Sequence, residues 1–420
     1  MAGYSKAQLN IIKQQALLYA QQQEVALLLD NNFTVNACNL TQVEFIAAFG
    51  VDDFVEVNST CFNTLDFFLK KHAGKYVFTQ LSYDIKNELE HLHSNHPNYV
   101  GFAKLIAFVP KQLLVVDAQL QVTEGTELAD FLLQANFSFD TVENATVVMQ
   151  PKVSKSQYLF DVECIKQHIV EGDVYELNYC MEYFNNQAVI NPFKVYDKLK
   201  AKSPVPFGAF FKWFDKYLIC ASPERFMCRK ADTVFVQPIK GTAPRGTNAV
   251  EDEQHKQALL NSEKERAENL MIVDLMRNDL AITAQTGTVK VEELFGIYSF
   301  PQVHQMISTV SSKPVTPINN IEVIKRAFPM GSMTGAPKIM AMQLIERYEQ
   351  TQRGLYSGAV GYFAPNGNFD FNVVIRSLQY NAQHKYLSYE VGSAITYDSI
   401  PEQEYEECLL KAEAMLAVLA

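Results

Sequence analysis

Hydrophobic and polar positions along the chain change their period several times, and each change predicts a different kind of element. Residues 5–30 have the spacing of a Gln-rich amphipathic helix, and residues 157–170 repeat that helical spacing. Between them, short apolar and β-branched runs predict strands at Lys75–Thr79, Lys104–Val109 and Leu113–Val116. The polar segment Asp140–Lys155 is the best linker candidate, and it separates regions of residues 1–145 and 150–420.

The second region is richer in short strands. The predicted strands are Phe207–Trp213, Tyr217–Cys220, Thr233–Val236, Gly358–Phe363 and Leu387–Val391, and long helices are predicted at 252–281, 318–327, 336–349 and 402–419. Strands in runs, with helices grouped around them, favour an α+β fold with largely antiparallel sheets over a regular βαβ repeat. We expect both regions to belong to one compact fold.

Composition narrows the classes of partner. The net charge is −11, which argues against nucleic acid as a partner, and no apolar run approaches the roughly 18 residues that a membrane span needs. The seven cysteines are scattered and form no C-x-x-C pair, as is typical of reduced thiols. We expect a soluble cytoplasmic protein that binds neither nucleic acid nor membranes.

Lys240 is the first candidate for chemistry, because it ends a β-branched and aromatic run and is followed at once by Gly241. A phosphate-binding loop has the reverse order, with the lysine after the glycines, so that motif is excluded. Glu224 lies between two predicted strands, which places it and Lys240 near the ends of neighbouring elements. A carboxyl and an amine in an apolar pocket can carry out proton or nucleophile chemistry, and a surface ion pair is the alternative.

Two helical segments place carboxylates on one face each. Glu265 and Glu268 are three residues apart before an apolar run, and Glu404 and Glu407 repeat that spacing with Lys411 one turn further on. Two such faces that meet at one point would suit Mg²⁺, which takes few protein carboxylates and completes its shell with water and substrate oxygens. Solvated acidic faces are the alternative.

Two further segments have features of an anion site. In Phe328–Lys338, two glycines and two prolines describe a loop that leads into a helix, and the amides near Thr334 could accept an anion or simply begin that helix. Arg376 stands in the apolar run FNVVIRS, where a buried arginine requires an acidic partner from the protein or from a ligand.

Taken together, these segments resemble the chorismate-utilising enzyme family. The resemblance runs in order from about residue 155 to 415, and it rests on SPERF, PIKGTAPRG, AENLMIVDLMRNDL, FPMGSMTGAPK, RGLYSGAVGYF, FNVVIRSL and GSAITYDSIPEQEYEECLLKAEAML. In the first third it is weaker and rests mainly on LSYDIK. The family resemblance implies two largely antiparallel sheets packed as a sandwich, with helices outside.

The resemblance also implies a role for each candidate residue. Glu224 would be the general acid at the C4 oxygen of chorismate, and Lys240 the nucleophile that attacks C2. Glu268 and Glu407 would hold Mg²⁺ against the ring carboxylate, with Glu265 and Glu404 in support. The residues implied in substrate binding are Arg376, Tyr356, Thr334, Thr242, Gly392, Ala394 and Lys411.

Lys240 also separates the members of the family. It is typical of the aminodeoxychorismate synthases, whereas anthranilate synthases and isochorismate enzymes carry alanine there. The resemblance therefore implies a component I that aminates chorismate at C4 for p-aminobenzoate and folate synthesis. Its ammonia would come from a separate glutamine amidotransferase subunit. The alternatives are anthranilate synthase component I, an isochorismate or salicylate synthase, and a non-catalytic binding protein of the same fold.

Three departures from the family pattern accompany this resemblance. Glu176 occupies a position where glutamine is frequent, and where the hydrating enzymes use a lysine as their base. Gln305 stands where histidine is frequent. The N-terminal signature of tryptophan-inhibited anthranilate synthases is absent, so we expect no tryptophan feedback.

Overall fold

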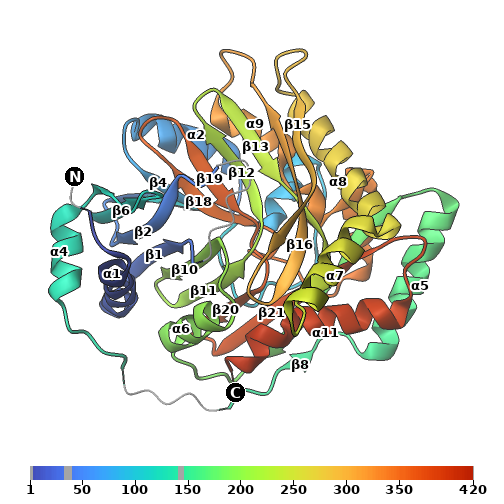
Figure 1. Cartoon of the computed structure of the whole chain (residues 1–420), viewed down its shortest axis with the longest axis horizontal. Helices are drawn as coiled ribbons and strands as arrows, with labels where there is room; N and C mark the ends of the chain where they lie inside the picture. The colour runs from blue at the N-terminus through green and yellow to red at the C-terminus, as the bar shows by residue number, and fades with distance from the viewer. Residues whose placement is uncertain (1–2, 33–39, 141–145, 420) are drawn as a thin grey trace.

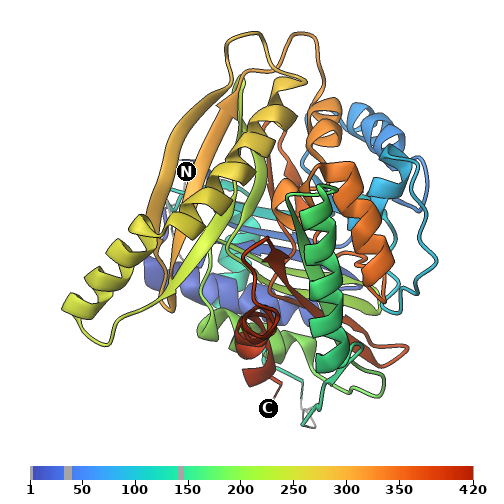
Figure 2. The ribbon, with the colours of Figure 1, turned by 90° about the vertical axis from the view of Figure 1, so that its right-hand side faces the viewer.

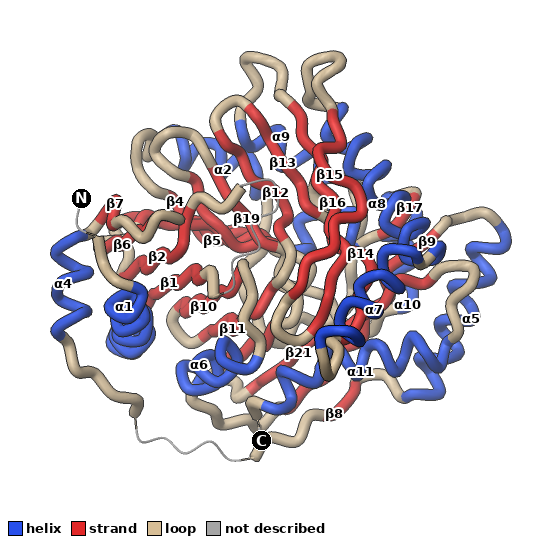
Figure 3. Tube along the Cα trace, in the orientation of Figure 1, coloured by secondary structure: helices blue, strands red, loops and turns tan. Residues whose placement is uncertain are grey.

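The computed structural model describes residues 3–32, 40–140 and 146–419, and its strands form two large sheets that lie face to face (Figure 1). The strand pairs are antiparallel. Figure 3 shows the strands in the middle of the molecule and the helices around them. The predicted α+β sandwich with outer helices is therefore confirmed.

The first sheet has the strand order β17 (Gly335–Ala336), β9 (Glu176–Asn185), β21 (Tyr386–Ile395), β20 (Ser377–Asn381), β11 (Lys216–Ser222), β10 (Phe207–Trp213), β1 (Val25–Asp30), β2 (Val43–Phe49), β6 (Gln112–Asp117) and β7 (Val122–Glu124), with β8 (Gln150–Pro151) paired to β9. The second has the order β14 (Ile239–Pro244), β16 (Val303–Ser312), β13 (Thr233–Gln237), β12 (Arg225–Lys230), β19 (Phe369–Asn372), β18 (Ala359–Phe363), β4 (Val77–Leu81), β5 (Leu105–Val109) and β3 (Asp53–Val57), with β15 (Lys290–Ser299) paired to β16.

Both sheets contain strands from both ends of the chain. In the first sheet Val25 of β1 lies opposite Trp213 of β10, and in the second Leu81 of β4 lies opposite Ala359 of β18. Part of the predicted linker, residues 141–145, lies outside the described residues. The regions on its two sides are joined through shared hydrogen-bonded sheets.

The inner core follows from the period of two along each strand. On β1, Val25 and Leu27 face the second sheet, whereas Ala26 and Leu28 face the outer helices. On β10, Phe211 in the same way fills the space between the sheets. Each sheet is thus apolar on both faces, and only helices on the outer faces can cover the remaining hydrophobic surface.

The helices are α1 (Lys6–Tyr19), α2 (Cys61–Lys71), α3 (Lys86–Leu89), α4 (Thr126–Gln134), α5 (Lys155–Glu171), α6 (Pro192–Lys202), α7 (Ala249–Asn261), α8 (Glu263–Ala281), α9 (Asn320–Ala327), α10 (Lys338–Tyr348) and α11 (Pro401–Ala417). Helices α1, α4, α5, α6, α10 and α11 cover the first sheet, and α2, α8 and α9 cover the second. Figure 2 shows α7 and α8 running beside the long β15–β16 hairpin.

Two helix predictions were too long. The predicted helix 5–30 ends at Tyr19, and its apolar end VALLLD is strand β1, because that run is buried on both faces of a central strand. The predicted helix 252–281 is two helices, α7 and α8. Ser262 separates them, and its hydroxyl accepts a hydrogen bond of 3.3 Å from the Glu265 amide as the N-cap of α8.

The cysteines that the structure describes are all free, and Cys38 lies outside the described residues. Within the described ranges, no helix has both the length and the apolar composition that a membrane crossing requires.

Candidate active site

A cavity of about 890 Å³ opens between the edges of the two sheets. Its walls are β14 and β16 from the second sheet, β21 from the first, helices α8 and α11, and the loops at residues 223–224, 332–333 and 375–376. The predicted site residues that line it are Glu224, Lys240, Thr242, Glu265, Glu268, Tyr356, Arg376, Gly392, Ala394, Glu404, Glu407 and Lys411. Of the predicted set, Thr334 alone is not part of this lining.

Lys240 enters the cavity from an irregular edge strand. The β14–β16 pairing shifts register between Ile239 and Thr242, and Gly241 has φ +96°, a conformation that favours glycine. The Lys240 carbonyl accepts a hydrogen bond of 3.3 Å from Asn269 of α8. Its Nζ lies 3.8 Å from Glu176 Oε2, and the lysine side chain is only 11% exposed.

Glu224 lies in the short turn between β11 and β12. Its amide donates to Ser222 Oγ at 3.2 Å, and its carbonyl accepts from the Val373 amide at 3.0 Å, so the backbone is fixed on both sides. Burial raises the pKa of the Glu224 carboxyl to about 7, although nearby Ser332 and Lys240 oppose the change. A carboxyl with this pKa can hold a proton at neutral pH and donate it.

The four predicted carboxylates lie on facing helices. Burial, opposed by Lys240 and reinforced by the charge of Glu265, raises the pKa of Glu268 to about 7. Burial also raises the pKa of Glu265. On α11, burial acts against ionisation of Glu407, but the ion pair with Lys411 at 2.7 Å lowers its pKa overall.

This donor set fits a hard divalent cation that keeps oxygens from water and substrate. Among the described residues, His168, Glu171 and Asp173 bring three ligand atoms within 4.8 Å of one another, and none of these residues lines the cavity. Glu265, Glu268, Glu404 and Glu407 all line the cavity, and carboxylate oxygens are the protein ligands that Mg²⁺ takes. A cation bound beside Glu268 would stabilise the ionised carboxylate and so oppose the effect of burial on its pKa.

Arg376 supplies positive charge at the inner end of the cavity. Its backbone has φ +50°, and no hydrogen bond or ion pair to the guanidinium occurs among the residues the structure describes. Burial lowers the pKa of Arg376, with Glu224 opposing the change. A half-buried guanidinium without a hydrogen-bonded carboxylate among the described residues is suited to an anionic ligand.

Gly392 lines the cavity at a point where β21 and β9 pack too closely for a side chain. A Cβ there would lie 2.4 Å from Cys180 Sγ, and the Gly392 carbonyl accepts from Lys411 Nζ at 2.9 Å. Thr334 is fully buried behind this wall. Its hydroxyl donates to the Met330 carbonyl at 3.1 Å, so it stabilises the loop instead of facing the cavity.

Several lining residues were absent from the predicted set. They are Asn178, Lys202, Lys264, Gln302, Glu390 and Glu413. Lys264 lies 3.8 Å from Glu268 one helical turn away, a pairing that the i, i+4 spacing could have predicted. Glu390 is two residues before Gly392 on β21 and shares its face, so the period of a strand could have predicted it. Gln305, noted as a departure, lies in the lining, and its buried Oε1 has no hydrogen bond from the residues that the structure describes.

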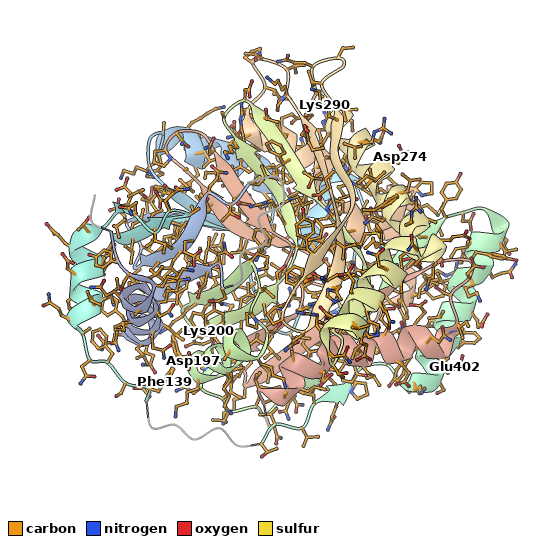
Figure 4. All side chains as sticks on the ribbon, in the orientation of Figure 1. Phe139, Asp197, Lys200, Asp274, Lys290 and Glu402 are labelled. Carbon is orange, nitrogen blue, oxygen red and sulfur yellow. The ribbon has the colours of Figure 1, made fainter. Side chains whose placement is uncertain are left out.

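The acidic residues of α8 and α11 differ in exposure. Figure 4 shows Asp274 of α8 and Glu402 of α11 at the surface of the molecule, and the Asp274 side chain is 74% exposed. Among the cavity-lining carboxylates, Glu404 is buried and Glu265 and Glu268 are partly buried, whereas the Glu407 side chain at the cavity mouth is 47% exposed.

Comparison with known proteins identifies the family. The profile of the chorismate binding enzymes matches residues 19–417, and the chain belongs to this family. The chloroplastic aminodeoxychorismate synthase of Arabidopsis thaliana is 41% identical over 269 residues, which cover 63% of this chain and 29% of that protein. Aminodeoxychorismate synthase component 1 of Salmonella typhimurium is 32% identical over 342 residues, which cover 80% of this chain and 74% of that protein.

A solved structure supports the fold. Anthranilate synthase component I from Streptococcus pneumoniae superposes with a TM-score of 0.78 at 24% identity, covering 91% of this chain and 94% of that one. The matched segment spans less than a third of the Arabidopsis relative. The chain is thus similar in sequence to aminodeoxychorismate synthases and in fold to an anthranilate synthase component I.

Proposed function

We propose that the chain is an aminodeoxychorismate synthase component I, which converts chorismate and ammonia to 4-amino-4-deoxychorismate. The observation that carries this proposal is the presence of the Lys240 amine and the Glu224 acid in one enclosed cavity. A nucleophile and a proton donor in the same site are what displacement of a hydroxyl requires. The aminodeoxychorismate synthase relatives support the same assignment.

Substrate binding follows from the distribution of charge. Chorismate is a dianion, and the cavity offers Arg376 and Lys411 as cationic groups despite the net charge of −11. Arg376 would hold the enolpyruvyl carboxylate beside Tyr356. Glu268 and Glu407, supported by Glu265 and Glu404, would hold Mg²⁺, which when bound neutralises the ring carboxylate.

The reaction then uses two side chains of the chain itself. Glu224, whose pKa is raised to about 7 by burial, gives its proton to the departing C4 oxygen. The neutral Lys240 amine adds at C2 as water leaves, which forms a covalent adduct. Ammonia then adds at C4, the bond to Lys240 breaks, and the ionised Glu224 takes up the proton that ammonia releases.

Ammonia would come from a separate glutamine amidotransferase subunit, and free ammonium would replace it in vitro. A separate lyase would complete p-aminobenzoate. These partners are part of the proposal, together with the place of the reaction in folate synthesis.

The test is a product assay with purified protein, chorismate, Mg²⁺ and ammonium. We expect 4-amino-4-deoxychorismate as the main product, its loss in Lys240→Ala, and retention of chorismate binding by that variant. Anthranilate or isochorismate as the main product would replace the proposal by one of the sibling activities. Chorismate binding without any turnover would indicate a binding protein. Arg277→Ala, on the outer face of α8, is the control that should leave the product unchanged.

A further inference from the structure

Lys240 cannot act as a nucleophile until its ammonium loses a proton. The lone pair that attacks carbon is present only on the neutral amine. Release of that proton into an enclosed cavity filled with a dianionic substrate and a cation would also separate charge. A proton acceptor next to the lysine gives that proton a destination within the protein, so no net charge crosses the cavity.

Glu176 is placed for this task. It is the first residue of β9, only 2% exposed, and its Oε2 is buried without a hydrogen bond among the described residues. The ion partner of that oxygen is Lys240 Nζ at 3.8 Å, about 1 Å longer than an N–H···O hydrogen bond. The four-carbon lysine stem can shorten this distance by rotation about its torsions.

The carboxylates that influence Lys240 come from four elements. They are Glu176 on β9, Glu224 in the β11–β12 turn, Glu265 and Glu268 on α8, and Glu407 on α11. Glu224 must donate a proton to the C4 oxygen in the same step, so it cannot accept one from the lysine. Glu265, Glu268 and Glu407 face the proposed cation. Glu176 is the remaining carboxylate, and it does not line the cavity.

We propose that Glu176 is the positioning residue that accepts the Lys240 proton before attack and returns it after the amine is released. This inference rests on the proposed function. Glu176 contacts Lys240 and is not among the residues that line the cavity, so it acts through the lysine and not on the substrate.

The protons balance over one cycle. The Lys240 ammonium passes a proton to the Glu176 carboxylate, which converts an ion pair into a neutral pair. The amine adds at C2, Glu224 protonates the C4 oxygen, and water leaves. Ammonia adds at C4 and gives a proton to Glu224, while the C2–N bond breaks to release neutral Lys240. Glu176 then returns its proton to Lys240, and the net reaction is chorismate and ammonia to aminodeoxychorismate and water.

The experiment compares Glu176→Gln with the unaltered protein in the ammonium-dependent assay from pH 6 to 8, with free ammonia held constant. Without Glu176, the Lys240 proton must be lost to water, so kcat/KM of the variant relative to the unaltered protein should rise about tenfold per pH unit. The descending limb caused by Glu224 is common to both proteins and cancels in the ratio. Glu176→Asp keeps a carboxylate on the strand, and its ratio should stay constant with pH.

Glu182→Gln is the matched control, because it removes another buried carboxylate from β9 that accepts a hydrogen bond from Tyr386 and none from Lys240. Its ratio should be independent of pH. A pH-independent loss in Glu176→Gln would show a merely structural role, and an activity equal to or above that of the unaltered protein would show a simple counter-ion. Either result overturns the inference. Failure of the proposed function is seen separately, as a different product from the unaltered protein.

Discussion

Replacement of Glu224 by glutamine should make the protein more stable at alkaline pH while it removes the proton donor. The native carboxyl keeps its proton up to about pH 7, whereas in the unfolded chain it ionises near its ordinary pKa of 4.5. Between these values the native state binds more protons than the unfolded state, so the free energy of unfolding falls as the pH rises. Glutamine has nearly the same shape and does not ionise.

The size of the effect follows from the same two values. Each tenfold change in a proton equilibrium corresponds to about 1.4 kcal/mol, so a pKa of about 7 in place of 4.5 corresponds to about 3 kcal/mol. Glu224 is 5% exposed, so solvent screens little of this energy. We expect Glu224→Gln and the unaltered protein to be equally stable below pH 4.5, and the variant to be about 3 kcal/mol more stable above pH 7.

Urea unfolding at several pH values measures this difference. The sole tryptophan, Trp213, is buried between the sheets and reports the loss of the core by fluorescence. Glu402→Gln removes an exposed carboxylate of α11 and should leave the pH dependence unchanged. A stability difference that is the same at pH 5 and pH 8 would refute the reasoning, because it would show that Glu224 does not hold a proton in the native state.

Three further outcomes are expected from the structure. Arg376→Leu should weaken chorismate binding about 10- to 100-fold, as expected for the loss of a hydrogen bond to a charged group. Calorimetry measures this affinity, and Arg277→Leu on the surface is the control that should leave it unchanged. Equal affinities of the two variants would contradict the role of Arg376. Glu349→Ala leaves the buried Arg353 guanidinium without its carboxylate partner and should lower the free energy of unfolding by about 3–5 kcal/mol in urea; a loss below about 1 kcal/mol would contradict the burial argument. Removal of divalent cations with EDTA should abolish amination, and added Mg²⁺ should restore it. The Glu268→Gln variant should require a higher Mg²⁺ concentration for its half-maximal rate. Full activity in EDTA would argue against a metal.

The elements that were predicted well are those whose period is regular over many residues. The carboxylate spacing of Glu265 and Glu268, and of Glu404 and Glu407, placed each pair on one helical face, and all four line the cavity. The long strands β9, β15 and β16 were missed. Many positions of β15 are partly exposed and interrupted by bulges, so its alternation is weak.

The convergence of distant segments could not be predicted from local pattern. The sequence spacing of Glu176 and Lys240 does not indicate that their side chains lie close together. Glu176 is on β9 of the first sheet and Lys240 on β14 of the second, so their contact depends on how the two sheets pack. Thr334 shows the opposite case, since a loop with the residues of an anion site uses its hydroxyl to bond its own backbone. The family resemblance predicted which distant residues share one site, and the structure shows which of their side chains line the cavity.

The interleaving of the two sheets has a consequence for biogenesis. Strands β1 and β4 each have one local partner, β2 and β5, but their other edges pair with β10 and β18, so those edges stay unpaired until residues 207–213 and 359–363 have been made. Native contacts of such large sequence separation slow folding, and unpaired strand edges are exposed to aggregation in the meantime. During synthesis, one edge of β1 and one edge of β4 are therefore open to non-native pairing until their distant partner strands appear.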